Sequence, residues 1–273
     1  MALLSSQGST ASSMEKKTGG NLEIRGWLDA SKERTEIDLK LQLLLASFDP
    51  PQMDGVSWQR LADQDWQESW KRHFKPQIIG NRLLVLPSWL SQPADTLDRL
   101  IIHMDPEMAF GSGSHESTRG CLEALERCAH QGGLTSLLDL GTGSGILAIA
   151  GVLLGADQVT ATDFDPIAVE TSQKNGRINQ VADKMEVLLT SDVPPGPFQT
   201  IVANILAPVL IDKAGEISHS LLPGGSLILS GILETQATEV CEAYRAHGFV
   251  NIEIFHLGEW VTIQAEKNEG GGC

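Results

Sequence analysis

A glycine-rich turn and one aspartate are the residues of this sequence whose types and spacing most directly suggest chemistry. The turn, residues 141–145 (GTGSG), follows the apolar run 137–140. Glycine lets the backbone turn sharply and approach a ligand closely. The helix N-terminus behind the turn would present free N–H groups to a carboxylate or phosphate. Asp163 lies 22 positions after Gly141, at the end of the next expected strand, where a carboxylate can accept both ribose hydroxyls. Together they predict a site for a nucleoside-containing cofactor.

The spacing of the glycines discriminates between cofactors. The dinucleotide pattern G-x-G-x-x-G requires a third glycine at position 146, where this chain has Ile146, and the third glycine is Gly145. The turn also lacks the lysine with which an ATP-binding loop holds phosphates. With an expected antiparallel hairpin at the end of the sheet, these features favour S-adenosylmethionine over NAD or ATP. Gly143 is expected to leave room for the methionine part of this cofactor.

A second carboxylate, Asp139, lies within the apolar run that precedes the turn. A buried carboxylate must be hydrogen-bonded, because desolvation of an unpaired charge is costly. Two interpretations remain open from the sequence. Asp139 either organises the glycine-rich turn or contacts the amino group of the cofactor.

Secondary-structure patterns place these residues in an alternating series of strands and helices. We predict, in chain order, a helix over 117–128, a strand over 134–140, a helix ending at 154, a strand over 158–163, a helix over 166–178, strands over 185–189 and 199–203, a helix near 207–221, a strand over 226–230, a helix over 234–247, and strands over 251–256 and 260–266. Such alternation indicates βαβ units and a parallel sheet. The short connection between the last two strands allows only an antiparallel pair. The expected fold class is α/β, with a Rossmann-like sheet and a terminal antiparallel hairpin.

The chain before this series is expected to be organised differently. Short strand-like and helical patterns predict a small N-terminal α+β lobe, and a turn at Gly80–Asn81 predicts a hairpin that connects the lobe to the main domain. Both ends are rich in small and polar residues. We therefore expect a flexible tail over 1–21, the lobe over 22–62, a linker and connecting hairpin over 63–108, the main domain over 109–267 and a second tail over 268–273.

Composition excludes several classes of protein. The 273 residues are 41% hydrophobic and 20% charged, which is typical of globular proteins and excludes a disordered or fibrous chain. The net charge of −15 argues against binding of nucleic acid through bulk electrostatics. It suits a small cationic ligand or a basic protein partner, or serves solubility alone. No apolar run approaches the length of a membrane span or a secretory signal. The four cysteines lack zinc-binding spacing, so we expect free thiols in the cytoplasm and no metal site.

Longer segments of the sequence resemble one known family. Residues 109–118, AFGSGSHEST, are similar to the AFGTGTHPTT segment of the PrmA family, the methyltransferases of the large-subunit ribosomal protein L11. The resemblance covers about residues 60–266, and its further motifs lie at 65–66, 74–76, 87–89, 143–150, 202–207, 229–233 and 259–260. It implies a class I methyltransferase domain over 109–267 that uses S-adenosylmethionine to methylate lysine or other amino groups of a protein.

The resemblance also assigns roles to single residues and to partners. The family's cofactor contacts correspond to Thr118, Gly141, Asp163 and Asn204. The lobe over 22–62 would recognise a basic ribosomal protein in the cytoplasm, with no nucleic acid, no membrane and a monomeric enzyme. Glu116 stands where the family has proline, and both suit the first turn of a helix. The shorter N-terminal lobe makes the substrate less defined than the chemistry.

Asn204 is the expected catalytic residue. It follows the strand over 199–203 and would therefore emerge at the carboxyl edge of the sheet, where ligands bind. Its side-chain carbonyl could accept N–H bonds of a substrate amine and direct the lone pair of that amine at the methyl group. His115 is the alternative candidate. The alternative functions are methylation of another protein, a small molecule or a nucleic acid on the same fold, and cofactor binding without catalysis.

Overall fold

The computed structural model describes residues 11–16, 22–27, 75–104, 115–132 and 134–270. The chain divides into two compact units, Met1–His73 and Phe74–Cys273. In the first unit, β1 (Ala11–Lys16) pairs antiparallel with β2 (Leu22–Trp27). Thus a strand lies within the segment expected to be a flexible tail. The other elements expected before residue 63 lie outside the described residues, as do residues 109–114 of the motif shared with the PrmA family.

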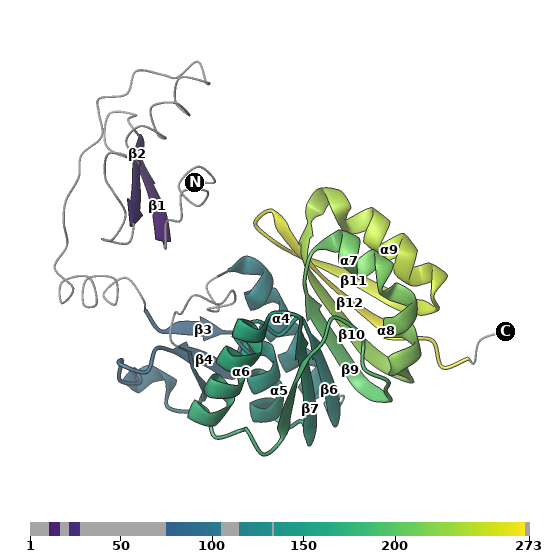
Figure 1. Cartoon of the computed structure of the whole chain (residues 1–273), viewed down its shortest axis with the longest axis horizontal. Coiled ribbons are helices and arrows are strands. Elements are labelled where there is room, and N and C mark those ends of the chain that lie inside the picture. Colours follow the sequence, from purple (N-terminus) through teal and green to yellow (C-terminus); the bar gives the residue numbers. More distant parts are fainter. Residues whose placement is uncertain (1–10, 17–21, 28–74, 105–114, 133, 271–273) are drawn as a thin grey trace. The chain divides into compact units, whose positions relative to one another are not determined.

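The second unit is built on a seven-stranded sheet (Figure 1). Its strands are β6 (Ser136–Leu140), β7 (Gln158–Asp163), β8 (Met185–Leu189), β9 (Phe198–Asn204), β10 (Leu221–Leu233), β11 (Phe249–Leu257) and β12 (Trp260–Lys267). They are ordered β11-β12-β10-β9-β6-β7-β8. The five strands from β10 to β8 are parallel, whereas β12 is antiparallel to both β10 and β11. The predicted Rossmann-like sheet with a terminal antiparallel hairpin is confirmed.

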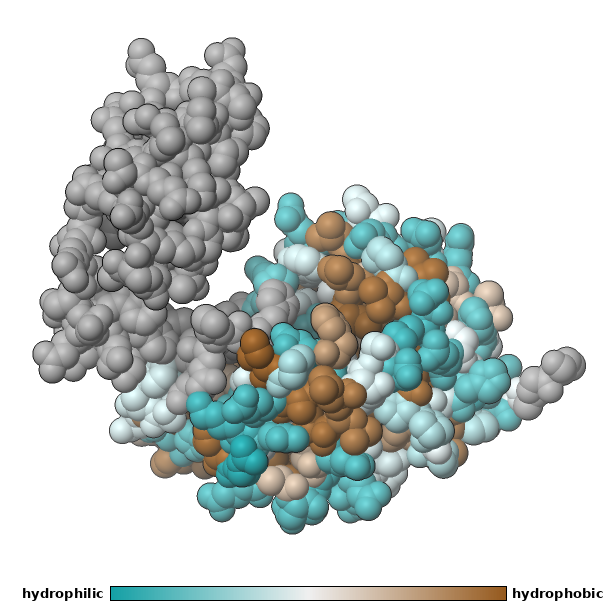
Figure 2. All heavy atoms as spheres, viewed as in Figure 1, coloured by the Kyte–Doolittle hydropathy of each residue, from teal (hydrophilic) through white to brown (hydrophobic). Residues whose placement is uncertain are grey.

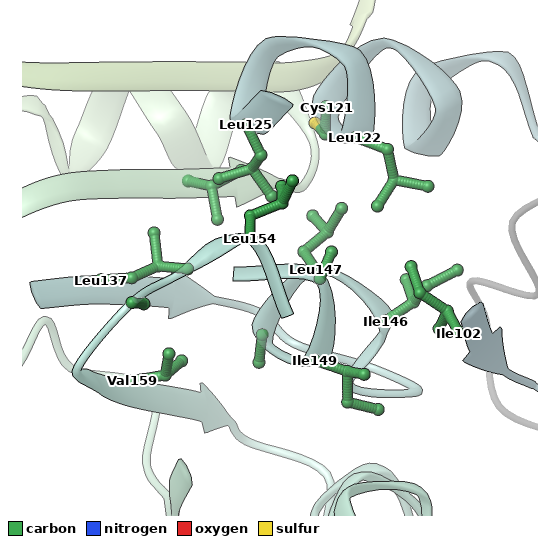
Figure 3. Close-up of a cluster of buried hydrophobic side chains, with 14 of the residues drawn as sticks. Ile102, Cys121, Leu122, Leu125, Leu137, Ile146, Leu147, Ile149, Leu154 and Val159 are labelled. Carbon is green, nitrogen blue, oxygen red and sulfur yellow. The ribbon is translucent and has the colours of Figure 1, made fainter. Parts of the chain in front are cut away.

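The α-helices of the described residues pack against this sheet. They are α4 (Glu116–His130), α5 (Ile146–Leu154), α6 (Pro166–Ile178), α7 (Ala207–Asp212), α8 (Ala214–Ser220) and α9 (Ala237–Ala246). Five of them form two groups, while α6 contacts β7 and β8. Buried side chains of α4 and α5 form one hydrophobic cluster with those of β6 and β7, and Figure 3 shows Leu122, Leu125, Leu137, Leu147 and Val159 within it. The buried side chains of α7, α8 and α9 form a second cluster with β9, β10 and β12. Helices therefore cover both faces, as in a doubly wound sheet.

Local sequence explains where the helices near the carboxyl edge begin. Helix α5 is apolar all round, as expected for a helix buried in a core. Helix α6 begins after Asp165, whose carboxylate accepts a bond from the Ile167 N–H, and has Pro166 in its first turn. Helix α4 begins with Glu116 after the N-cap residue His115. Glutamate therefore occupies the first turn of this helix, as expected for a residue that replaces proline.

A small sheet precedes the main one in the chain. It consists of β3 (Gln77–Ile79), β4 (Leu83–Leu86) and β5 (Leu100–His103), with β3 and β4 antiparallel and β4 and β5 parallel. The carboxylate of the buried Glu126 in α4 accepts bonds from the N–H groups of Asn81 and Arg82. The predicted hairpin around Gly80–Asn81 is thus present and attached to α4, whereas β5 has no counterpart in the sequence-based prediction.

Other elements differ from the prediction at their ends. The helix expected near 207–221 is two helices, α7 and α8, separated at Lys213. Strand β10 is longer than expected, and its register shifts where it pairs with β9 and where it pairs with β12. The helix expected over 234–247 begins as a short 3-10 turn, Glu234–Gln236, followed by α9. Asn204 is the last residue of β9, whereas the prediction placed it just after the strand.

Candidate active site

A cavity of about 440 Å³ lies at the carboxyl ends of β6, β7 and β9. Adjacent strands β6 and β9 are the point at which the strand order of the parallel sheet reverses, and ligands bind in doubly wound sheets at such points. All five predicted site residues line this cavity, together with His115. The five are Thr118, Gly141, Gly143, Asp163 and Asn204. The structure thus brings together residues that are up to 86 positions apart in the sequence.

The glycine-rich turn is shaped by its own backbone. Gly141 and Gly143 have positive φ angles of 76° and 54°, a region that residues with a Cβ rarely occupy. A Cβ at Gly141 would overlap the Cγ2 of Ile205. The N–H groups of Gly141, Thr142, Gly143 and Gly145 all bond within the protein. These four N–H groups are therefore engaged, and the turn offers the cavity close approach of its backbone. The free N–H groups were expected at the helix behind the turn, where the Ala148 N–H bonds to Asp139.

Asp139 organises this turn. Its Oδ2 accepts bonds from the Thr142 hydroxyl at 2.6 Å and from the Ala148 N–H at 3.1 Å, so it joins the turn to the first part of α5. Asp139 is fully buried, and the cavity lining does not include it. Burial raises the pKa of its carboxyl to about 7; the two hydrogen bonds oppose this shift, and the charge of Asp163 adds to it. The structure thus favours the first of the two interpretations of Asp139.

Asp163 is held with both carboxylate oxygens in fixed directions. Oδ2 accepts the Gly143 N–H at 2.9 Å and Oδ1 accepts the Asp165 N–H at 3.0 Å. The residue is 8% exposed and lines the cavity. Because a carboxylate oxygen can accept more than one hydrogen bond, each oxygen can also accept a hydroxyl. Two neighbouring hydroxyls of a ribose fit this arrangement, so the site fits an adenosine-containing cofactor.

Asn204 and Thr118 meet across the cavity wall. The Nδ2 of Asn204 donates to the Oγ1 of Thr118 at 3.3 Å. Thr118 is buried in the first turns of α4, and Asn204 is partly buried at the end of β9. Since the amide nitrogen is engaged by Thr118, the amide oxygen of Asn204 is the acceptor that this side chain can offer to a ligand.

His115 and Trp260 form a further part of the wall. Their rings meet edge to face with centroids 4.7 Å apart, and both residues line the cavity. The Nδ1 of His115 accepts the Ser117 N–H at 3.3 Å and lies 2.8 Å from the Ser117 hydroxyl. These bonds give His115 a structural role as the N-cap of α4. The ring contact also ties the last strand, β12, to the beginning of α4.

Exposed apolar residues at the cavity are the part of the site that sequence reasoning missed. Phe164, Leu206 and Val209 line the cavity with exposed fractions of 77%, 69% and 40%. Hydrophobic residues also form a patch on the face of the molecule seen in Figure 2. An aromatic residue directly after Asp163 was a signal available in the sequence. Leu206 and Val209 gave none, because their exposure depends on how α7 packs.

The doubly wound sheet with its terminal antiparallel hairpin, the glycine-rich turn and the cavity carboxylate define a class I methyltransferase that depends on S-adenosylmethionine. Among the described residues, no group of three or more His, Cys, Asp and Glu side chains is placed to hold a metal ion. In the part of the chain that the structure describes, no helix has the length and apolar character needed to cross a membrane.

Comparisons with known proteins give the family. Residues 4–268 match the family "Ribosomal protein L11 methyltransferase (PrmA)". A ribosomal protein L11 methyltransferase of Geobacter sp. strain M21 is 43% identical over 237 residues, which cover 81% of this chain and 75% of that protein. One from Pelotomaculum thermopropionicum is 39% identical over 89% of this chain and 78% of that protein. The chain therefore belongs to the ribosomal protein L11 methyltransferase family, and S-adenosylmethionine is its cofactor.

A solved structure agrees with this assignment. The crystal structure of a ribosomal protein L11 methylase from Lactobacillus delbrueckii subsp. bulgaricus superimposes with a TM-score of 0.62 at 30% sequence identity. The superposition covers 71% of this chain and all of that chain. The resemblance stated from the sequence motifs is thus confirmed.

Proposed function

We propose that this protein transfers methyl groups from S-adenosylmethionine to lysine or other amino groups of ribosomal protein L11. The observation that carries the proposal is the amide of Asn204, which lies on the same cavity as the glycine-rich turn and Asp163 and whose nitrogen is engaged by Thr118. The names of the relatives support ribosomal protein L11 as the substrate. The amino group is inferred from the chemistry of the cavity and from the family resemblance.

The cofactor would be held by three features of the cavity. Asp163 would accept the two ribose hydroxyls with the oxygens that Gly143 and Asp165 already orient. Phe164 would offer its exposed ring to the flat adenine, since aromatic faces pack well on planar rings. Gly141 and Gly143 would leave space for the amino-acid end. When bound, S-adenosylmethionine supplies a methyl group that its positively charged sulfur has already activated.

The protein would then present a neutral amine in line with that methyl group. A lysine side chain has an ordinary pKa of about 10.4 and is protonated at neutral pH. The apolar residues Leu206, Val209 and Trp260 at the cavity would lower this pKa by desolvation. The proton would leave to solvent, and the Asn204 oxygen would accept an N–H of the amine. The protein would accelerate the reaction by positioning and orienting the amine, which can supply a large part of a rate enhancement.

The acidic chain suits the proposed partner. A net charge of −15 favours encounter with a basic protein. We further propose that the enzyme acts as a monomer in the cytoplasm, without direct contact to nucleic acid, and that residues 22–62 contribute to recognition of the substrate.

The direct test is methyl transfer to purified ribosomal protein L11. The protein would be incubated with L11 and isotopically labelled S-adenosylmethionine, and mass spectrometry would locate the label. We expect label on lysine side chains or on the N-terminal amine of L11, and almost none with the Asn204→Ala variant over the same time. If L11 stays unlabelled while another ribosomal protein acquires methyl groups, the substrate assignment is wrong and the chemistry stands.

A further inference from the structure

Two asparagines one turn apart on α6 bind two different segments of the backbone. The Nδ2 of Asn175 donates to the Ser144 carbonyl oxygen at 2.8 Å and lies 3.3 Å from the Sδ of Met104. The Nδ2 of Asn179, the residue that caps the end of α6, donates to the His103 carbonyl oxygen at 2.8 Å, and its Oδ1 accepts the His103 N–H at 2.7 Å. Both asparagines are buried, with exposed fractions of 3% and 9%. Of the two, it is Asn175 that reaches the glycine-rich turn.

The contact of α6 with the turn is close. Ser144 lies between Gly143 and Gly145, both of which have positive φ angles. A Cβ at Gly145 would lie 2.6 Å from the Oγ and 3.2 Å from the Cα of Ser172, one turn before Asn175. Helix α6 thus forms the surface on which this part of the turn rests, and Asn175 is placed to hold the Ser144 carbonyl there.

We propose that Asn175 is a positioning residue for cofactor binding, which acts through the Ser144 carbonyl to fix the glycine-rich turn. The Gly143 N–H orients Asp163, so the hold on Ser144 also bears on the carboxylate assigned to the ribose. A buried hydrogen-bonded amide favours one conformation of the groups that it joins. Loss of the donor leaves a buried carbonyl without this partner and permits the turn to adopt other conformations. The inference rests on the proposed cofactor contacts of the turn and Asp163.

The matched pair Asn175→Asp and Asn179→Asp tests the inference. Each substitution is isosteric, and each removes a buried amide donor. The amide of Asn175 donates to the Ser144 carbonyl, and that of Asn179 donates to the carbonyls of His103 and Asn175. One residue lies in the last turn of α6 and the other caps its end, at similar burial. A purely structural role therefore predicts a loss of stability in both variants and no difference in ligand affinity. Affinity for S-adenosylmethionine would be measured by calorimetry, with thermal unfolding and steady-state kinetics of each variant.

We expect Asn175→Asp to raise the dissociation constant and the KM for S-adenosylmethionine about tenfold or more, with kcat at saturating cofactor within about threefold of the wild type. Asn179→Asp should lower the unfolding temperature at least as much as Asn175→Asp does, because the Asn179 side chain bonds three backbone groups, with an unchanged dissociation constant. Equal dissociation constants for the two variants would overturn the proposal. If either Asp variant fails to fold, Asn175→Ala and Asn179→Ala make the same comparison without an added charge.

A comparison of the wild type with Asp163→Ala tests the proposed cofactor site separately from the role of Asn175. If the wild type binds S-adenosylmethionine and Asp163→Ala binds it as tightly, the proposed ribose contact is wrong. If Asp163→Ala weakens binding and Asn175→Asp does not, the cofactor site stands and only the positioning role of Asn175 falls.

Discussion

The glycine side of the cavity, which comprises residues 141–145 with Asp139 and Asp163, differs in construction from the open side, which comprises Asn204, Leu206, Val209 and Trp260. On the glycine side, buried carboxylates bond backbone N–H groups, so one conformation is strongly favoured. On the open side, Leu206 and Val209 are exposed, and the Asn204 amide is held to Thr118 by a longer bond of 3.3 Å. This difference suits two ligands: an unvarying small cofactor and a side chain presented by another protein.

Gly143→Val should have the largest effect, because it alters the glycine side directly. The branched side chain would occupy cavity space at a residue with a φ of 54°, a conformation that valine avoids. We expect no measurable binding of S-adenosylmethionine by calorimetry, and a folded protein by circular dichroism. Native affinity in this variant would show that the turn is only a packing element and that the contrast between the two sides is unfounded.

Asn204→Ala should separate the open side from the glycine side. Since the amine loses its acceptor, turnover on ribosomal protein L11 at saturating cofactor should fall about 100-fold, which corresponds to about 2.7 kcal/mol. The unfolding temperature should remain near that of the wild type, because Asn204 is only partly buried, at the carboxyl end of β9. Wild-type turnover would exclude Asn204 as the positioning group and direct attention to His115.

Asp163→Ala should weaken the binding of S-adenosylmethionine to the glycine side without filling the cavity. Charge-assisted hydrogen bonds contribute roughly 1.5–3 kcal/mol, so the dissociation constant of S-adenosylmethionine should rise about tenfold or more. Calorimetry checks this value, and kcat at saturating cofactor should change less than it does in Asn204→Ala. If Asp163→Ala lowered kcat more than Asn204→Ala does, the glycine side would not serve cofactor binding alone, and the open side would not serve methyl transfer alone.

Asp139→Asn should produce the smallest change, which appears in the pH dependence of stability. The pKa of Asp139 is raised to about 7 in the folded protein, so the folded state retains a proton that the unfolded state releases near pH 4. The proton retained by Asp139 therefore adds to the free energy of unfolding at low pH. This addition declines as pH rises towards 7, by at most about 1.4 kcal/mol per pH unit. Denaturant unfolding between pH 5 and 6 should show a shallower decline for the Asp139→Asn variant than for the wild type. Parallel curves for both proteins would contradict the burial argument.

The glycine side was predictable from the sequence because its signals are local. The glycine spacing and Asp163, at the end of the following strand, are read along one βαβ unit. The pairing of Asn204 with Thr118 was not predictable, since it joins residues 86 positions apart through the packing of α4 on the sheet. The same holds for the bond from Asn175 to Ser144. The sequence position of a residue was enough to predict its role at the site. Its hydrogen-bond partners could be identified only from the folded structure.

Some elements of the fold were missed for physical reasons of the same kind. Strand β5, at 100–103, is only four residues long, and it pairs in parallel with β4 across a long connection. The break between α7 and α8 falls at Lys213, which is neither a proline nor a glycine, so the residue itself does not predict a helix end. The longer β10 contains residues 223–225 (PGG), a sequence that predicts a turn. In β10 tertiary packing overrides the local signal, and for β5 and the break between α7 and α8 the local signal is weak.

The contact of Trp260 with His115 has a consequence for synthesis of the enzyme. Strand β12 is added to the sheet beside β10, where Trp260 pairs with Leu233. A growing chain that has emerged only as far as β10 already contains the glycine-rich turn, Asp163 and Asn204, yet it lacks this wall of the cavity. An enzyme of this family thus completes this wall of its site only after β12 has left the ribosome.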